Sequence, residues 1–429
     1  MSMDDRTEEF QMVDNGHNVN EIANEMEAFV TKIAFPRYFG TSNEARAREI
    51  IKEEINRVGL NYEIDPFTAS EFFMKYINQV PYYAFGACVL VFTMLILLAY
   101  NPLETIAYSV ALIILAFSIE EIIHAVKYRS MYSRYATLKE SENILVAKKA
   151  EHPDAADSVN IYLVAHSDSK SEKLDPTKWM TIEYVSVLFG TVLLSVHAIV
   201  FSLFAWFDGV FLHPTWLFSY GLILGIIDML RIATAYYEGD SPGATDDAIG
   251  VVVAIAVQQR IATMAFKHVT TVTVISGAEE IGEAGVYNFI KKRKVELQPE
   301  KNHFIIIDGL TSWKYHYFTS AGFLFKPFSK LVSSALKAII QTPNDAIKQF
   351  TFSKLWMPPP VNTDHSAVVK LGYPAFVLES GFAGTHTHRD TVDKIDFKAT
   401  ACFVDVLVDL IQEIDRMIEV MKSKTRSIS

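Results

Sequence analysis

The sequence predicts an α/β fold in which a mixed β-sheet, flanked by helices, is interrupted by two hairpins of transmembrane helices, four in all. Short β-branched runs alternate with amphipathic helical segments, and this alternation is typical of α/β proteins. Four long apolar stretches lie between these elements. They raise the mean hydropathy of the 429-residue chain to +0.17 although 21% of its residues are charged.

The α/β elements follow one another in a readable order. Ile51, Ile55 and Val58 recur at helical spacing within residues 45–58, and Gly59 then ends that helix. An alternating segment at 61–65 predicts the first strand. The same patterns predict further strands at 143–147, 160–165, 270–276, 304–308 and 375–378, and helices at 247–264, 284–294, 327–341 and 397–422.

Three of the apolar stretches, residues 82–100, 184–207 and 209–227, carry no charge, and each approaches or exceeds the roughly 20 residues that cross a bilayer. The stretch 105–119 is shorter and reaches across only if it extends to about residue 126. Turns near Asn101 and Asp208 would join the helices in pairs. Buried core helices are the alternative interpretation.

Basic residues near the other helix ends predict the orientation. The two turns contain neither lysine nor arginine, so the rest of the chain should be cytoplasmic and the protein a multi-pass integral membrane protein in contact with lipid. The basic residues that favour this are Lys75, Lys127, Arg129, Arg134, Lys178 and Arg231. Glu120, Glu121 and His124 lie near one of these ends, where they either mark the cytoplasmic interface or bind a metal ion through the Glu-x-x-His spacing.

The expected organisation is one domain in three pieces. A disordered tail (1–20) precedes the α/β pieces 21–78, 127–178 and 237–429, which the hairpins 79–126 and 179–236 separate. The net charge of −11 argues against a nucleic-acid partner. Two cysteines provide no disulfide framework.

Polar side chains with metal-binding chemistry stand at the ends of the predicted strands. Two divalent metal ions held close together need one bridging carboxylate and roughly two further ligands each, and mixed imidazole and carboxylate ligands suit zinc. A neighbouring unbound glutamate can act as the general base. The candidates, in chain order, are His166 with Asp168, Asp246, the pair Glu279 and Glu280, Asp308, and His386.

Each candidate alone has an ordinary structural explanation. A single histidine at a strand end is usually a hydrogen-bonded structural residue, and a glutamate pair is usually solvated. Five such segments in a fixed order favour the metal interpretation.

These segments resemble, in order, the co-catalytic di-zinc aminopeptidases of metallopeptidase clan MH, family twenty-eight. Residues 36–41 also resemble the segment that precedes the first helix of that family. The resemblance implies a zinc-exopeptidase fold and two Zn²⁺ ions with a shared bridging ligand. It implies these ligands: His166 and Asp308 for one zinc, Glu280 and His386 for the other, and Asp246 between them.

The resemblance also implies the remaining roles. Glu279 would be the general base, Asp168 would orient His166, and His365 would help hold the substrate carbonyl. The chain departs from the family at Asp247, where many members have asparagine, at Ile249 and Ile306, and at Thr385, where tyrosine usually precedes the last histidine. None of these departures removes a ligand or the base, but they leave substrate positioning open.

The sequence thus predicts a membrane-integrated zinc aminopeptidase that removes N-terminal residues from peptides through a metal-bound hydroxide. A carboxypeptidase or an N-acyl amino acid hydrolase on the same scaffold is the alternative among enzymes. Glutaminyl cyclase activity is less expected, because ligands for two metals are kept. A non-catalytic membrane scaffold is the alternative outside enzymes.

Overall fold

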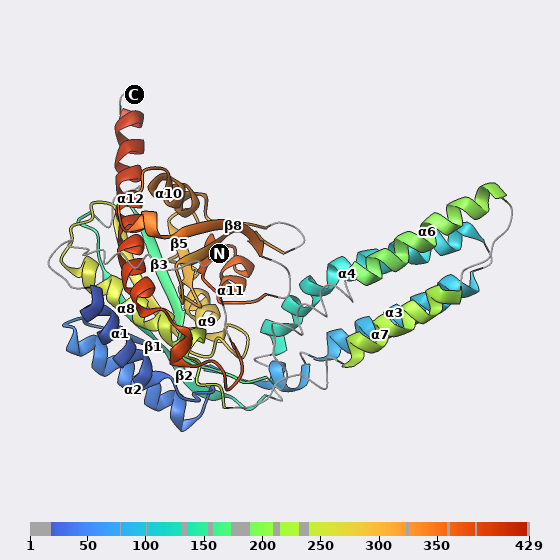
Figure 1. Ribbon diagram of the computed structural model, residues 1–429, viewed down its shortest axis with the longest axis horizontal. Helices are drawn as coiled ribbons and strands as arrows, with labels where there is room; N and C mark the ends of the chain where they lie inside the picture. The colour runs from blue at the N-terminus through green and yellow to red at the C-terminus, as the bar shows by residue number, and fades with distance from the viewer. Residues whose placement is uncertain are drawn as a thin grey trace, which may run out of the picture.

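A computed structural model describes the chain over residues 19–77, 79–99, 101–130, 136–152, 158–172, 189–208, 215–230, 240–322, 326–357, 361–381 and 384–426. A nine-stranded mixed sheet with helices on both faces forms one body, and four helices form an arm that projects from it (Figure 1). The α/β architecture with a mixed sheet is therefore confirmed. Residues 1–18 of the expected tail lie outside the described residues.

The sheet runs in the order β1-β2-β4-β3-β5-β9-β6-β7, and β8 pairs with β6. The four central strands β4, β3, β5 and β9 are parallel, so their carboxyl ends meet at one edge, where ligands gather in α/β proteins. The strands are β1 Glu63–Ala69, β2 Lys139–Lys148, β3 Val159–His166, β4 Val269–Ser276, β5 Asn302–Ile307, β6 Lys314–Ala321, β7 Lys326–Pro327, β8 Thr351–Met357 and β9 Ala375–Glu379.

Helices cover both faces of this sheet because its central strands are apolar on both sides. In β3, Ile161 and Leu163 face one core cluster, and Tyr162 and Val164 face the other. The first face carries α1 (Val19–Ile33), α2 (Ser42–Arg57), α8 (Ile249–Ala262), α10 (Lys330–Gln341) and α12 (Phe397–Arg426), and the second carries α9 (Ala284–Arg293) and α11 (His365–Lys370).

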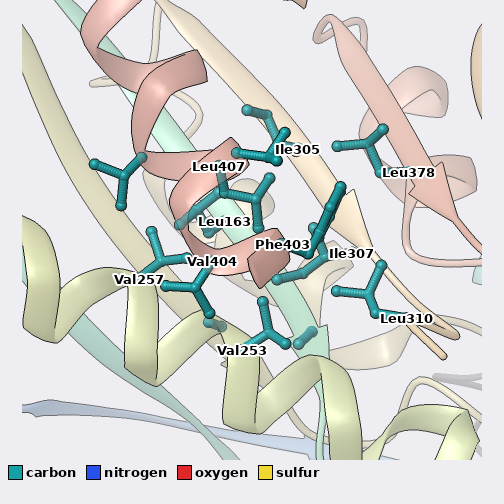
Figure 2. Close-up of a cluster of buried hydrophobic side chains, with 14 of the residues drawn as sticks. Leu163, Val253, Val257, Ile305, Ile307, Leu310, Leu378, Phe403, Val404 and Leu407 are labelled. Carbon is teal, nitrogen blue, oxygen red and sulfur yellow. The ribbon is translucent and has the colours of Figure 1, made fainter. Parts of the chain in front are cut away.

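The first core is built mainly where α12 lies across α8 and the sheet. Figure 2 shows Val253 and Val257 of α8 directed toward Phe403 and Leu407 of α12, with Leu163 of the sheet beside them. All five side chains are buried. This packing fixes the strands whose ends carry the candidate ligands.

The arm consists of α3 (Gln79–Leu98), α4 (Pro102–Ser130), α6 (Gly190–Asp208) and α7 (Thr215–Leu230). α3 packs chiefly against α7 and α4 against α6, so each pair joins the two inserted segments (Figure 1). Phe85, Leu112, Leu194 and Leu224 form part of a small core inside the arm.

The prediction of four transmembrane helices is wrong. Among the described residues, only Gly190–Phe207 is long and apolar enough to cross a membrane, and a third of that segment is buried within the structure. The apolar parts of α3 and α4 are Tyr83–Leu98 and Pro102–Ser118, and α7 has 16 residues. A helix of 16 residues is about 24 Å long, which is less than the roughly 30 Å of a bilayer core.

The predicted multi-pass membrane location and the lipid partner depended on those four spans, and the structure contradicts that location and does not support the lipid partner. Lys127, one of the basic residues used for the orientation, is instead buried in an ion pair with Glu283. Arg134, Lys178 and Arg231 lie outside the described residues, as do the side chains of Glu120, Glu121 and His124.

Candidate metal centre

The candidate residues meet at the edge formed by the carboxyl ends of β3, β4 and β5. His166 is the last residue of β3, Glu279 and Glu280 follow β4 in a short loop, and Asp308 follows β5. Asp246 precedes α8, and His386 lies in the segment after β9. The fold thus places the five predicted segments together.

Arg37 ties two of these segments to each other. Its fully buried guanidinium donates from Nε to the carbonyl of Ser167 (2.7 Å) and from Nη2 to that of Gly243 (2.8 Å). It also donates to the carbonyl of Pro242 (2.5 Å). The guanidinium group of arginine is planar and carries several N–H donors, so one side chain can bond to several carbonyl groups at fixed positions.

Asp246 lies between two histidines. Its Oδ1 is 2.9 Å from Nε2 of His166, and its Oδ2 is 3.1 Å from Nε2 of His386. Burial alone would raise the pKa of Asp246, but the two histidines hold that pKa well below its usual value. One carboxylate therefore faces both imidazoles, as a bridging ligand would.

His386 also approaches two glutamates. Its Nε2 is 3.3 Å from Oε2 of Glu280, and its Nδ1 is 2.9 Å from Oε1 of Glu172. The backbone of His386 lies in the left-handed region at φ 58°, and its carbonyl accepts a hydrogen bond from the N–H of Glu172 (2.7 Å). Such backbone strain in a non-glycine residue is concentrated at functional sites.

Lys170 places a positive charge next to Glu280. Its Nζ lies 3.0 Å from Oε2 of Glu280, and its backbone N–H donates to Oε1 of the same carboxylate (3.2 Å). Burial alone would raise the pKa of Glu280, but Lys170 and His386 lower it. Glu280 is therefore held as a carboxylate.

Asp168 organises the glutamate pair. Its carboxylate accepts the backbone N–H of Glu279 (3.0 Å) and of Glu280 (3.1 Å). Nδ1 of His166 is 3.2 Å from the backbone carbonyl of Asp168 and 3.6 Å from its carboxylate. The side chain thus holds the loop after β4, while the main chain contacts the histidine.

Glu279 has no salt-bridge partner among the described residues, although it is buried. Burial, together with the charge of Glu280, raises its pKa well above the usual value despite the opposing effect of His166. A carboxyl group in this environment has a high affinity for a proton.

Among the described residues, two groups of side chains are close enough to hold a metal ion. One consists of His166, Asp246 and Glu280, and the other of His166, Asp247 and Asp308. Oδ1 of Asp308 is buried without a hydrogen-bond partner, and burial beside Asp247 raises the pKa of Asp308 well above its usual value. An orphaned carboxylate oxygen beside an imidazole fits a divalent metal such as zinc.

Asp390 contacts the segment that carries Asp246, and His365 is the first residue of α11. His365 is buried, with Nδ1 2.9 Å from Oγ1 of Thr363, and burial lowers its pKa to about 3. Asp390 accepts from the N–H (2.6 Å) and hydroxyl (2.7 Å) of Thr245 and from the N–H of Asp246 (3.3 Å). Burial raises the pKa of Asp390 to about 6.

Sequence reasoning assigned no role to five residues of this neighbourhood, namely Arg37, Lys170, Glu172, Asp247 and Glu283. Arg37 lies in the segment 36–41 that the sequence singled out, and Lys170 and Glu172 follow the His166 motif within six residues. Their contacts join residues that are 81 to more than 200 positions apart in the sequence, such as His386 and Glu172. The spacing of residues within one motif therefore does not predict these contacts.

The fold is α/β with a mixed sheet, and the site brings together imidazole and carboxylate groups that suit a metal ion such as zinc. The family model described as Peptidase family M28 matches residues 225–411. The chain is therefore similar to that family over this part of its sequence. No curated protein sequence matches the chain.

Solved structures are similar to the chain at low sequence identity. A glutaminyl cyclase from Fimbriiglobus ruber is 12% identical, with a TM-score of 0.52, and the match covers 94% of this chain and 97% of that one. A zinc aminopeptidase from Bacillus subtilis is 13% identical, with a TM-score of 0.49, and the match covers 92% and 96%. A glutaminyl cyclase from an Acidobacteriales bacterium is 13% identical, with a TM-score of 0.49, and the match covers 95% and 99%.

Proposed function

We propose that the protein is a zinc-dependent aminopeptidase that releases N-terminal residues from peptides. The observation that carries this proposal is the buried Glu279, which stands next to Glu280 and has no ion-pair partner among the described side chains. Its neighbour Glu280 contacts His386, which in turn contacts Asp246. A base beside a ligand set is the arrangement that peptide hydrolysis requires.

The ligands would be divided between two zinc ions. His166 and Asp308 would hold one, Glu280 and His386 the other, and Asp246 would face both. When bound, the metal ions polarise the peptide carbonyl and make a nearby water more acidic.

The side chains then carry out the proton transfers. Glu279 accepts a proton from the attacking water and gives it to the leaving amine, since burial raises its affinity for protons. Asp168 holds the backbone of Glu279 in place. His365, held neutral by its low pKa, would donate a hydrogen bond from its ring N–H to the substrate carbonyl.

The test is hydrolysis of a panel of aminoacyl fluorogenic amides by the purified protein and by Glu279→Gln, with zinc content measured on both. We expect the variant to keep its zinc and to lose about 10²- to 10⁴-fold in kcat. Glu300→Gln, at an exposed position, is the control and should behave as wild type. Equal turnover in Glu279→Gln and wild type would refute the role of Glu279.

Amides with blocked N-termini separate the other amide hydrolases on this scaffold. An aminopeptidase requires the free amine, whereas an N-acyl amino acid hydrolase requires it blocked. Cleavage of blocked substrates alone would exclude an aminopeptidase.

One contact favours a second candidate, a glutaminyl cyclase. The ammonium of Lys170 lies 3.0 Å from Glu280, where it competes with a second metal ion for that carboxylate. The fold is also shared with the glutaminyl cyclase from Fimbriiglobus ruber. Loss of ammonia from peptides that begin with glutamine, with one zinc ion per chain, would select this alternative.

A further inference from the structure

The last turn of α4 reaches the loop that carries the glutamate pair. Nζ of Lys127 forms an ion pair with both carboxylate oxygens of Glu283, at 2.5 Å from Oε1. The hydroxyl of Tyr128 donates to Oε2 of Glu283 at 2.9 Å. All three side chains are buried. The ring of Tyr128 stacks on that of Tyr287 in α9, with centroids 4.4 Å apart and an interplanar angle of 7°.

Glu283 is joined in turn to the main chain of Glu279. The carbonyl of Glu279 accepts the N–H of Gly282 (2.8 Å) and of Glu283 (2.7 Å), and the carbonyl of Ala278 accepts the N–H of Ala284 (3.0 Å). The backbone of Glu283 has a φ of 54°, so the loop turns sharply before α9 begins. A displacement of Glu283 therefore moves the backbone that carries Glu279.

Stability alone gives little reason to bury this ion pair. Removing two charges from water costs several kcal/mol per ion, and a hydrophobic pair of similar volume is often as stable. Charged hydrogen bonds do, however, fix distance and direction more narrowly than apolar contacts. The contacts of Lys127 and Tyr128 thus constrain where Glu283 lies.

We propose that Lys127 and Tyr128 are positioning residues: by holding Glu283 they fix the loop 278–284 and, through it, the carboxylate of Glu279. The helical arm is then part of the framework of the metal centre. This inference rests on the proposed function, because it takes Glu279 as the general base.

The experiment compares wild type with Lys127→Met and with the double variant Lys127→Met/Glu283→Gln. The single variant leaves a buried carboxylate without its cation and can lose stability for that reason alone. The double variant removes both charges and keeps the hydrogen bond from Tyr128. The control is Lys52→Met, because Lys52 of α2 forms a comparable ion pair with Glu142 of β2 (2.5 Å), beside a second pair with Glu49 of its own helix (2.8 Å).

We expect the double variant to recover most of the melting temperature but to keep a kcat roughly 10- to 100-fold below wild type, with KM changed less than about threefold, since displacing a catalytic group by about 1 Å has an effect of this size. Lys52→Met should lower the melting temperature and leave kcat unchanged. If kcat of the double variant recovers together with its melting temperature, the pair is only structural and the proposal is overturned.

Amide hydrogen exchange separates this inference from the proposed function, because it needs no turnover. The N–H groups of Gly282, Glu283 and Ala284 should exchange roughly tenfold faster in the double variant than in wild type, and should not change in Lys52→Met. Unchanged exchange at these amides would overturn the proposal whatever the enzyme assay shows. Faster exchange in a protein without peptidase activity would support the coupling and refute the proposed function.

Discussion

At the scale of single residues, the site depends on buried polar side chains, each of which links two segments of the chain through hydrogen bonds. Arg37 joins the loop after β3 to the loop before α8, and Asp168 joins the first of these loops to the one after β4. Leaving a buried carbonyl or N–H without a partner costs about 1–3 kcal/mol. The geometry of the metal centre is therefore set by residues that need not touch a metal.

Arg37→Met tests this directly. The variant leaves the carbonyls of Ser167 and Pro242 without the guanidinium donor and removes one of the two donors to Gly243, so the free energy of unfolding should fall by about 3 kcal/mol. Denaturant titration measures the change. Arg37→Lys keeps the charge but not the fork, and it should recover only part of the loss; full recovery would show that charge alone is needed.

His303 provides a pH prediction away from the site. Burial lowers the pKa of His303 to about 4, and its Nδ1 lies 2.9 Å from Oγ of Ser329. Between pH 6.5 and 4 the unfolded chain binds a proton at this position that the folded chain does not, so stability falls as the pH falls through this window. At pH 5 the loss is about 2 kcal/mol.

His303→Gln removes this titration. The decrease in unfolding free energy between pH 7 and pH 5 should be about 2 kcal/mol smaller in the variant than in wild type, as followed by urea denaturation. Parallel pH profiles for the two proteins would contradict the assignment.

At the scale of elements, α9 is seated very close to the loop that precedes it. A Cβ at Gly285 would stand 2.3 Å from the carbonyl oxygen of Gly277 and 2.5 Å from Oδ1 of Asn143. Both neighbours are tied to buried strands, so neither can move freely. The helix can therefore begin here only with glycine in this place.

Gly285→Ala should displace the loop 278–284 and lower both stability, by about 1–3 kcal/mol, and kcat. Gly59→Ala is the control, because a Cβ there meets no atom within 4 Å and the change acts through its positive φ alone. Both variants should melt earlier, but only Gly285→Ala should lose activity. Normal kcat in Gly285→Ala would show that the loop tolerates displacement.

Some elements could be predicted from sequence, and others could not. Buried strands such as β4 are continuous β-branched runs, so residues 269–276 were expected almost in full. β6 and β8, near the sheet edge, alternate aromatic with polar residues and were missed. α1 was missed too, although Ala23, Met26, Phe29, Val30 and Ile33 lie at helical spacing on its buried face.

The site shows the same division. His166 is the last residue of a strand and Asp308 directly follows one, so the strand pattern of the sequence is enough to locate both. The contacts of Lys127 with Glu283 cross 156 positions and depend on where the arm meets the domain. The transmembrane prediction is wrong because it rests on the length of apolar runs in the sequence, whereas among the described helices only Gly190–Phe207 is long and apolar enough to cross a membrane.

At the scale of the whole molecule, the candidate ligands come from segments between residue 166 and residue 386, and the fold places them at one site. Asp247 and Asp308 are buried, and burial together with neighbouring carboxylates, Asp246 for both and Asp247 for Asp308, raises the pKa of each. A metal bound at this point would therefore stabilise most of the α/β domain.

Chelation should lower the melting temperature, and added zinc should restore it. At free zinc about 1,000-fold above Kd, the gain is about 4 kcal/mol. Asp308→Asn should be more stable than wild type in EDTA, because it removes a buried like charge, and should gain less from zinc. Equal zinc-induced shifts in both proteins, measured by scanning fluorimetry, would exclude Asp308 as a ligand.

The pairing of α3 with α7 and of α4 with α6 bears on the order in which the protein is made. At about 5–20 residues per second, β3 leaves the ribosome roughly 5–20 s before its neighbour β4. The helices α6 and α7, which complete the arm begun by α3 and α4, emerge in that interval. We expect the arm to form first. The loop 278–284 then packs against the end of α4, which has already folded. The segment that is synthesised later therefore takes its conformation from contacts with the segment synthesised earlier.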